Sequence, residues 1–203
     1  MRNIPFSTNA LGAALVGLGL AFGAHAQTST TTPTSPKPSA ATGSMTVTSK
    51  ASTDKVSGAD KSFAEKAAIG GMAEVQLGNM AQQKAASEQV KQFAARMVTD
   101  HSKANDELKQ IASTKGMQLP AAPDDKHKKE MDRLQKMSGA DFDKAYMSHM
   151  VDDHKKDVSE FKKQAGSGND ADLKAFASKT LPTLQEHLQL AQATNDAVKK
   201  GSK

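Results

Sequence analysis

Two five-residue segments of the sequence place an acid and a histidine in the same context. Residues 97–101 read Met-Val-Thr-Asp-His, and residues 150–154 read Met-Val-Asp-Asp-His. A third acid–histidine pair, Glu186-His187, lies near the C-terminus. Neutral imidazole is a ligand for zinc, copper, iron and nickel, and a carboxylate extends the range to harder ions. The three pairs therefore indicate a metal site or a buried polar cluster, provided that the fold brings them together.

Helical periodicity dominates the sequence from about residue 62 onward, and no segment alternates at period two for long enough to predict a strand. We expect four long helices and one short one, over approximately 62–84, 87–115, 124–137 (the short helix), 138–165 and 170–200. Ser62 and Glu65 have the spacing of a capping box at the first of these starts. Pro182 predicts a kink in the last helix.

The connections between the long helices predict how they are wired. The first and last connections are short, whereas roughly 23 residues, including the short helix, separate the second and third long helices. Such a link can run the length of a neighbouring helix, while a simple up-down-up-down bundle needs only a few residues there. The sequence therefore predicts an all-α, ferritin-like four-helix bundle with a long crossover. The relative direction of the helices on either side of the crossover stays open.

Each long helix has an apolar seam with a polar residue near its middle. These four residues are Glu74, His101, His154 and His187. At 1.5 Å per residue they lie at similar levels whichever way the helices run, so we predict that they converge. One possibility is that they bind a single transition-metal ion, which could be Zn, Cu, Ni, Mn or Fe. The alternative is a buried hydrogen-bond network that specifies how the helices pair.

Five neighbouring residues are candidates for supporting roles. Asp100, Asp153 and Glu186 lie about 100° from the seams. They could accept hydrogen bonds from the imidazoles, although solvated acids are the ordinary case on helices. Met97 and Met150 each precede a seam histidine by one turn. Sulfur would suit copper, but methionine also fills gaps in helical cores.

Two glycines and one further histidine have positions that bear on the cluster. Gly70 and Gly78 lie one turn either side of Glu74. They leave room for a ligand or let another helix approach closely, and the sequence does not decide between these. His149 lies about 140° from His154 around the same helix, so we expect it to face water.

The N-terminal 26 residues have the features of a secretory signal: Arg2, an apolar run over about 10–23, and Ala24-His25-Ala26 as a cleavage site. The run is shorter than the about 20 residues that span a bilayer, so membrane attachment is expected only if the signal stays uncleaved. Residues 27–59 are rich in Ser, Thr and Pro and predict a disordered tether before a bundle domain at 60–200. We therefore expect a periplasmic or secreted protein.

Composition disfavours several classes of function. The chain has 27 Lys and Arg against 22 Asp and Glu, one Tyr and no Trp, so no basic patch with interleaved aromatic residues predicts nucleic-acid binding. It has no Cys, which excludes disulfides, cysteine-linked lipid and covalent haem attachment. No nucleophile–base pair or phosphate-binding glycine loop is present. No catalytic residue is assigned, and an enzyme is the less favoured class.

Several motifs resemble one family of bacterial envelope proteins. They are the repeated Met-Val-x-Asp-His, Gly-Gly-Met-Ala-Glu at 70–74, Gly-x-x-Leu-Pro at 116–120 and Thr-Leu-Pro-x-Leu-x-Glu-His at 180–187. Residues 63–192 as a whole resemble the family known as domain of unknown function 4142. The resemblance implies a ferritin-like bundle in an exported protein and no established activity. A protein partner is not implied.

The sequence departs from the pattern of ferritin-like di-iron proteins. Those carry Glu-x-x-His on two helices and a Glu on each of the others. Here the residue three before each seam histidine is Val98, Val151 or Leu184. One core carboxylate cannot bridge two irons and balance their charge, so a mononuclear site is favoured. Two hypotheses follow: a module that binds one metal ion, and a structural or stress-related envelope protein with a buried polar core.

Overall fold

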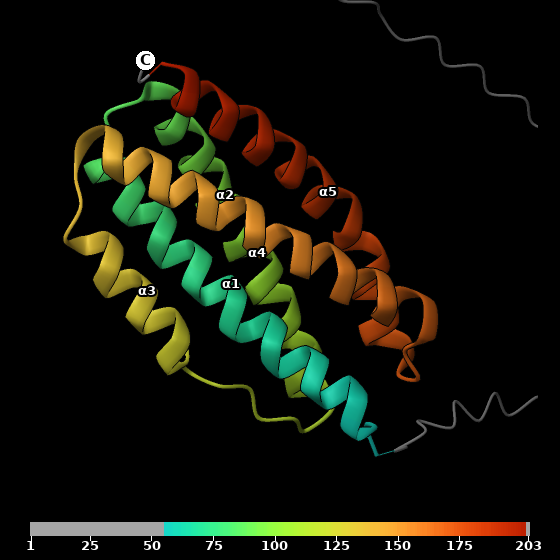
Figure 1. The fold of residues 1–203 in the computed structure, drawn as a ribbon. Coiled ribbons are helices and arrows are strands. Elements are labelled where there is room, and N and C mark those ends of the chain that lie inside the picture. The colour runs from blue at the N-terminus through green and yellow to red at the C-terminus, as the bar shows by residue number, and fades with distance from the viewer. Residues whose placement is uncertain (1–54, 202–203) are drawn as a thin grey trace, which may run out of the picture. The chain divides into compact units, whose positions relative to one another are not determined.

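The structure is a computed structural model that describes residues 55–201. This part of the chain is entirely helical, as predicted, with α1 at Gly58–Lys84, α2 at Glu88–Thr114, α3 at Asp125–Gln135, α4 at Gly139–Ser167 and α5 at Ala171–Lys200 (Figure 1). None of these helices is long and apolar enough to cross a membrane. The expected signal at 1–26 and most of the expected tether lie outside the described residues.

The crossover makes α2 and α4 run in the same direction. α1 packs against α2 and α4, and α5 packs against α4 and α2, which puts α2 and α4 at opposite corners of the bundle (Figure 1). The backbone N–H groups of Ala86 and Ser87, just before α2, donate to Asp143 near the start of α4, at 3.1 and 2.8 Å. At the other end, Lys115 after α2 pairs with Asp170 before α5, at 2.7 Å. The ferritin-like wiring is confirmed, and the direction that the sequence left open is parallel.

The start of α1 differs from the prediction. The helix begins at Gly58 with Ser57 as its N-cap, four residues before the expected start at Ser62. Ser57 Oγ accepts a hydrogen bond from the backbone N–H of Asp60 at 3.1 Å and donates one to the Asp60 carboxylate at 2.7 Å. The capping pattern at Ser62 and Glu65 is therefore not the one that the fold uses.

The carboxylate of Asp60 holds three helices together at one end of the bundle. Besides Ser57, it accepts hydrogen bonds from the Gln164 side chain at 2.6 Å and from the backbone N–H groups of Asn169 and Asp170 at 3.2 and 3.1 Å. Gln164 lies near the end of α4, and the other two residues precede α5. Burial raises the pKa of Asp60, but these donors outweigh that effect and lower it.

Two apolar clusters fill the core on either side of the level of Glu74. One contains Leu77, Phe93 and Tyr146 and includes the side chains of Met97 and Met150. The other is built around the three phenylalanines Phe63, Phe161 and Phe176, whose rings contact one another in pairs. The polar residues of the candidate site therefore lie between two apolar layers, shielded from bulk water.

The two glycines that flank Glu74 serve different purposes. A Cβ on Gly78 would lie 2.8 Å from Val98 Cγ2 and 3.0 Å from the Ala94 carbonyl oxygen, so this glycine lets α1 and α2 approach closely. A Cβ on Gly70 would meet nothing within 4 Å. Of the two alternatives for these glycines, close approach applies at Gly78, and Gly70 leaves open space beside the site.

We predict that Asp60→Ala lowers the free energy of unfolding by about 2 kcal/mol at neutral pH, because it leaves buried donors without an acceptor. Since the folded-state pKa of Asp60 is lowered, its contribution is present above the pKa of the unfolded chain and is lost as the pH falls through the lower folded-state value. Urea unfolding of wild type and variant should therefore converge below about pH 4. Asp106→Ala, on the exposed side of α2, is the control and should stay near wild type at every pH. An equal effect of both substitutions would contradict this account.

Candidate metal centre

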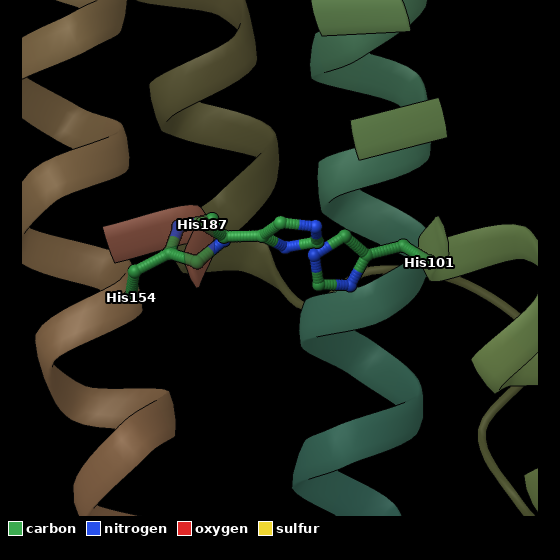
Figure 2. Close-up of side chains that lie close together, drawn as sticks. All are labelled: His101, His154 and His187. Atoms are coloured by element: carbon green, nitrogen blue, oxygen red, sulfur yellow. The ribbon is translucent and has the colours of Figure 1, made fainter. Parts of the chain in front are cut away.

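Four polar side chains from four helices meet at the middle of the bundle. Glu74 of α1, His101 of α2, His154 of α4 and His187 of α5 are 0, 6, 0 and 1 % exposed. The three ring centroids lie 5.3–5.7 Å apart. One ring nitrogen of each imidazole lies within 4.8 Å of one from each of the others, and Figure 2 shows the rings pointing toward one another. The structure thus brings together the four residues that the seams single out.

One nitrogen of each imidazole faces an oxygen that can only accept. His154 Nδ1 lies 2.9 Å from the Met150 carbonyl oxygen, one turn earlier in α4. His187 Nε2 lies 2.8 Å from Asp100 Oδ2, and His101 Nδ1 lies 2.7 Å from Glu74 Oε2. A carbonyl or an ionised carboxylate has no proton to donate, so each of these nitrogens carries the hydrogen. The hydrogen bonds of His154 and His187 fix the tautomers of these two rings, and the Glu74 carboxylate favours a hydrogen on Nδ1 of His101.

The opposite nitrogens are left without partners. His101 Nε2, His154 Nε2 and His187 Nδ1 are buried and form no hydrogen bond with any described residue. In the neutral tautomers set by the oxygens, each of these atoms presents a lone pair. A metal-ligating histidine has this arrangement, with one nitrogen held by a carboxylate or carbonyl and the other free to bind.

Glu74 lies on the protonated side of two of the rings. Its Oε2 is 2.7 Å from His101 Nδ1, and its Oε1 is 3.3 Å from His154 Nδ1. Neither oxygen receives a well-aligned hydrogen bond from a described residue, so the carboxylate is held mainly by its electrostatic attraction to the protonated side of each ring. Burial raises the pKa of Glu74, but the two imidazoles lower it to about 2. The buried carboxylate is therefore ionised.

The imidazoles respond in different ways to the same surroundings. Burial lowers the pKa of His101, but the Glu74 carboxylate outweighs burial and raises it. Burial lowers the pKa of His187 to about 4, although its hydrogen bond to Asp100 acts in the opposite direction. His187 is therefore neutral at neutral pH, with Nδ1 unprotonated.

Three acids were candidates for supporting the imidazoles, and they have three different environments. Asp100 accepts from His187 and also from Arg96 Nε at 3.2 Å. Glu186 is 61 % exposed at its side chain and contacts only the other end of that guanidinium, at 2.6 Å. Asp153 is buried, with an oxygen near Glu74 instead of a histidine. The structure thus places Asp100 alone of the three in contact with a ring.

Met97 and Met150 are completely buried in the apolar cluster on one side of the site. Their burial agrees with the ordinary packing role of methionine. Met150 contributes to the site through its backbone, because its carbonyl oxygen orients His154. A role for either sulfur as a ligand stays a prediction.

The structure adds residues that the seam pattern did not identify. Asp157, one turn after Asp153 in α4, has an oxygen within 4.8 Å of those of Glu74 and Asp153. Burial, and then these two carboxylates, raise the pKa of Asp157 well above its usual range. Tyr146 has a buried hydroxyl without a hydrogen-bond partner among the described residues. The i, i+4 spacing of the two aspartates was the available signal for Asp157.

His149 does not face water, and that expectation was wrong. Its side chain is only 17 % exposed, and its Nδ1 lies 3.6 Å from Glu130 Oε1. Glu130 belongs to α3, which packs over this side of α4 and covers the histidine. Burial lowers the pKa of His149. His149 is not one of the three rings that meet at the centre.

Comparison with known proteins identifies the family. Residues 45–194 match the family described as Domain of unknown function (DUF4142). The chain belongs to the DUF4142 family. No curated protein sequence matches it significantly.

Solved structures share the fold of this DUF4142 protein. A DUF305 fragment from Deinococcus radiodurans is 9 % identical, with a TM-score of 0.62, covering 70 % of this chain and 98 % of the fragment. CopM in its Cu(II)-bound form is 17 % identical, with a TM-score of 0.59, covering 68 % of this chain and 96 % of CopM. A DUF305 protein from Streptomyces coelicolor, described as a candidate secreted protein, is 14 % identical, with a TM-score of 0.56, covering 66 % and 89 %. At these identities the likeness establishes the fold.

The hydrogen-bond pattern predicts the tautomers of the metal-free DUF4142 protein near neutral pH. His154 should carry its hydrogen on Nδ1 and leave Nε2 bare, whereas His187 should have the reverse arrangement. Long-range ¹H–¹⁵N correlation spectra distinguish a protonated ring nitrogen from a bare one, and His154→Gln and His187→Gln variants assign the signals. A His154 ring with a bare Nδ1 would overturn the assignment of its free nitrogen.

Proposed function

We propose that this DUF4142 protein binds one transition-metal ion through His101 Nε2, His154 Nε2 and His187 Nδ1. The observation that carries the proposal is the matched state of the three rings. Each holds an oxygen acceptor on one nitrogen and has a buried, unpartnered nitrogen on the other. Leaving three such atoms unpaired in a core costs about 1–3 kcal/mol each. A shared metal ion removes that cost.

The ligand set favours borderline metals. Three neutral imidazoles suit copper and zinc better than manganese, which prefers oxygen ligands. Metal–nitrogen distances are about 2.0–2.1 Å, so ring nitrogens that lie within 4.8 Å of one another must move inward to share one ion. A cavity of about 20 Å³ beside His101, lined also by Gly70 and Gly71, is large enough for one water molecule. It offers room for that adjustment and for a fourth ligand.

In this proposal Glu74 has a different role from the direct ligand that the sequence suggested. Its oxygens face the protonated nitrogens of His101 and His154, so it would fix the rings and supply a negative charge beside a bound cation. Asp100 would do the same for His187. Arg96, which pairs with Asp100 and Glu186, would keep Asp100 in position.

The structural neighbours and the N-terminal sequence support a proposal for where in the cell the metal ion is bound. CopM has been solved with Cu(II) and with Ag, and it has the same fold. The signal-like segment at 1–26 and the neighbour described as a candidate secreted protein fit an exported protein. We infer that the metal-binding function operates in the periplasm or outside the cell, in storage, buffering or sensing of the ion.

Metal binding should stabilise the fold. Copper or zinc in hundredfold excess over Kd should add about 2.7 kcal/mol to the free energy of unfolding, which corresponds to a rise of roughly 5–10 °C in the melting temperature. A chelator should reverse the rise. His187→Gln keeps a donor for Asp100 but removes Nδ1, so it should abolish most of the rise without unfolding the protein. Thermal denaturation of untagged, metal-free protein measures this.

Controls separate the metal site from a purely structural network. His127→Gln, in α3 and paired with Asp124 instead of the central cluster, should leave the metal response intact. His101→Ala and His154→Ala should remove it and also lower the stability of the metal-free protein. A wild type that responds to none of Zn, Cu, Ni, Mn and ferrous iron would rule out the proposal. In that case the cluster is a polar network, and replacing all of it by apolar residues would be neutral or stabilising.

Export has its own test. Cleavage after Ala26 predicts that the exported protein begins at Gln27, because small residues at Ala24 and Ala26 follow the apolar run. Mass spectrometry of the protein recovered from the periplasm or medium measures its N-terminus. Recovery with residues 1–26 intact would mean that the segment is retained as an anchor.

A further inference from the structure

A second group of potential ligands lies on the α1 side of the histidines. Glu74 of α1 and Asp153 and Asp157 of α4 each have a carboxylate oxygen within 4.8 Å of an oxygen of the other two. Glu74 is fully buried, and both of its oxygens lack an aligned hydrogen-bond donor among the described residues. Asp153 is 7 % exposed, and Asp157 is half-buried. These three residues are called the carboxylate cluster below.

The protein supplies little positive charge to this cluster. The nearest lysine contact is Lys156 Nζ, 3.9 Å from Asp153 Oδ1, and the Lys156 side chain is 58 % exposed. Because the contact is long and its lysine end lies in solvent, this pair contributes little. Asp157 has no hydrogen bond or ion pair within residues 55–201. The imidazoles of His101 and His154 face Glu74 but not the two aspartates.

Comparison of the two copies of the repeated motif shows that Asp153 lacks the hydrogen-bond donors that Asp100 has. Asp100 and Asp153 occupy the same place in the two Met-Val-x-Asp-His segments. Asp100 faces α5 and finds the Nε2–H of His187 and the guanidinium of Arg96. Asp153 faces α1 and finds the Glu74 carboxylate. One aspartate thus has two donors, while its counterpart adds a negative charge to a site that already holds one.

Two of the three carboxylates, those of Asp153 and Asp157, line a surface groove of about 220 Å³. The other charged or titratable residues on its walls are Lys66, Lys126, Lys156, His127, Asp124 and Glu160. Lys66 is paired with Glu160 at 3.4 Å, so its charge is already partly neutralised. No atom lies within 4 Å of the place where a Cβ on Gly70 would be. An ion can therefore reach Asp153 and Asp157 with part of its water shell, and Glu74 lies behind them.

We propose that Glu74, Asp153 and Asp157 form a second cation site, made only of oxygen ligands, that takes a hard divalent cation such as Mn²⁺ or Ca²⁺. Carboxylates and water are the ligands that these ions prefer, whereas copper and zinc favour imidazole. Two oxygens bound to one ion at about 2.4 Å can be at most about 4.8 Å apart, and the cluster meets that limit. The two sites share Glu74, which also faces His101 and His154, but Asp153 and Asp157 belong to the carboxylate cluster alone.

The test is a titration of the metal-free, full-length protein with Mn²⁺, in which the EPR signal of the free ion reports binding. Wild type should bind one Mn²⁺ per chain, and Ca²⁺ should displace it. Asp153→Asn and Asp157→Asn preserve side-chain size but remove a charged ligand, so each should weaken binding by about tenfold or more. Asp152→Asn, an exposed neighbour in the same helix, should bind as wild type does. His187→Gln should also keep Mn²⁺ binding.

A stability measurement guards against variants that simply fold poorly. Asp157→Asn keeps the side-chain size and places no charge beside Glu74 and Asp153, so its melting temperature without metal should equal or exceed that of wild type. Mn²⁺ should then raise the melting temperature of wild type but not that of Asp157→Asn. Absence of Mn²⁺ binding to wild type, or equal binding by Asp153→Asn and Asp157→Asn, would overturn the second site. Loss of Mn²⁺ binding in His187→Gln would show a single shared site instead of two.

Discussion

The ionised carboxylate of Glu74, fully buried among the helices, is the constraint on which the rest of the site depends. An isolated carboxylate in such a place would cost several kcal/mol or take up a proton. Here it stays ionised because His101 and His154 face it from two other helices. That requirement fixes the level of three helices at once. A slip of α1 by one turn, about 5.4 Å, would leave the charge among apolar side chains.

The crossover explains how two copies of one motif can serve one site. Because α2 and α4 are parallel and diagonal, the Met-Val-x-Asp-His segments point their histidines at the same axis from opposite corners. An approximate twofold axis would exchange α2 with α4 and α1 with α5. It would also exchange Glu74 with His187, and those residues differ. The same motif therefore meets a histidine on one side and a carboxylate on the other, which separates a nitrogen-rich half of the site from an oxygen-rich half.

Sequence reasoning identified the bundle, its crossover and the convergence of Glu74, His101, His154 and His187, because helical periodicity and rise per residue determine faces and levels. It failed where contacts between distant segments determine the start of a helix or the burial of a side chain. The sequence predicted a cap at Ser62 and Glu65, whereas the fold uses Ser57 and Asp60. Asp60 is favoured because its carboxylate also accepts hydrogen bonds from Gln164 and from the N–H groups before α5. His149 is covered because α3 lies over it, and the path of a crossover is not encoded in helical spacing. Helical spacing alone does not distinguish Asp157 from the solvated acids of the same helix.

The tautomers provide the strongest distinction between a metal site and a structural network. A network that only specified helix pairing would gain by having partners on both nitrogens of each ring, since an unpaired buried nitrogen is costly. In this core each ring has one nitrogen beside an oxygen acceptor, and the three nitrogens that lack partners are the opposite ones. The helices that carry the rings are packed on both sides by apolar layers. Each lone pair is therefore held in place before a ligand arrives, so an ion that binds there has little ordering of side chains left to oppose it.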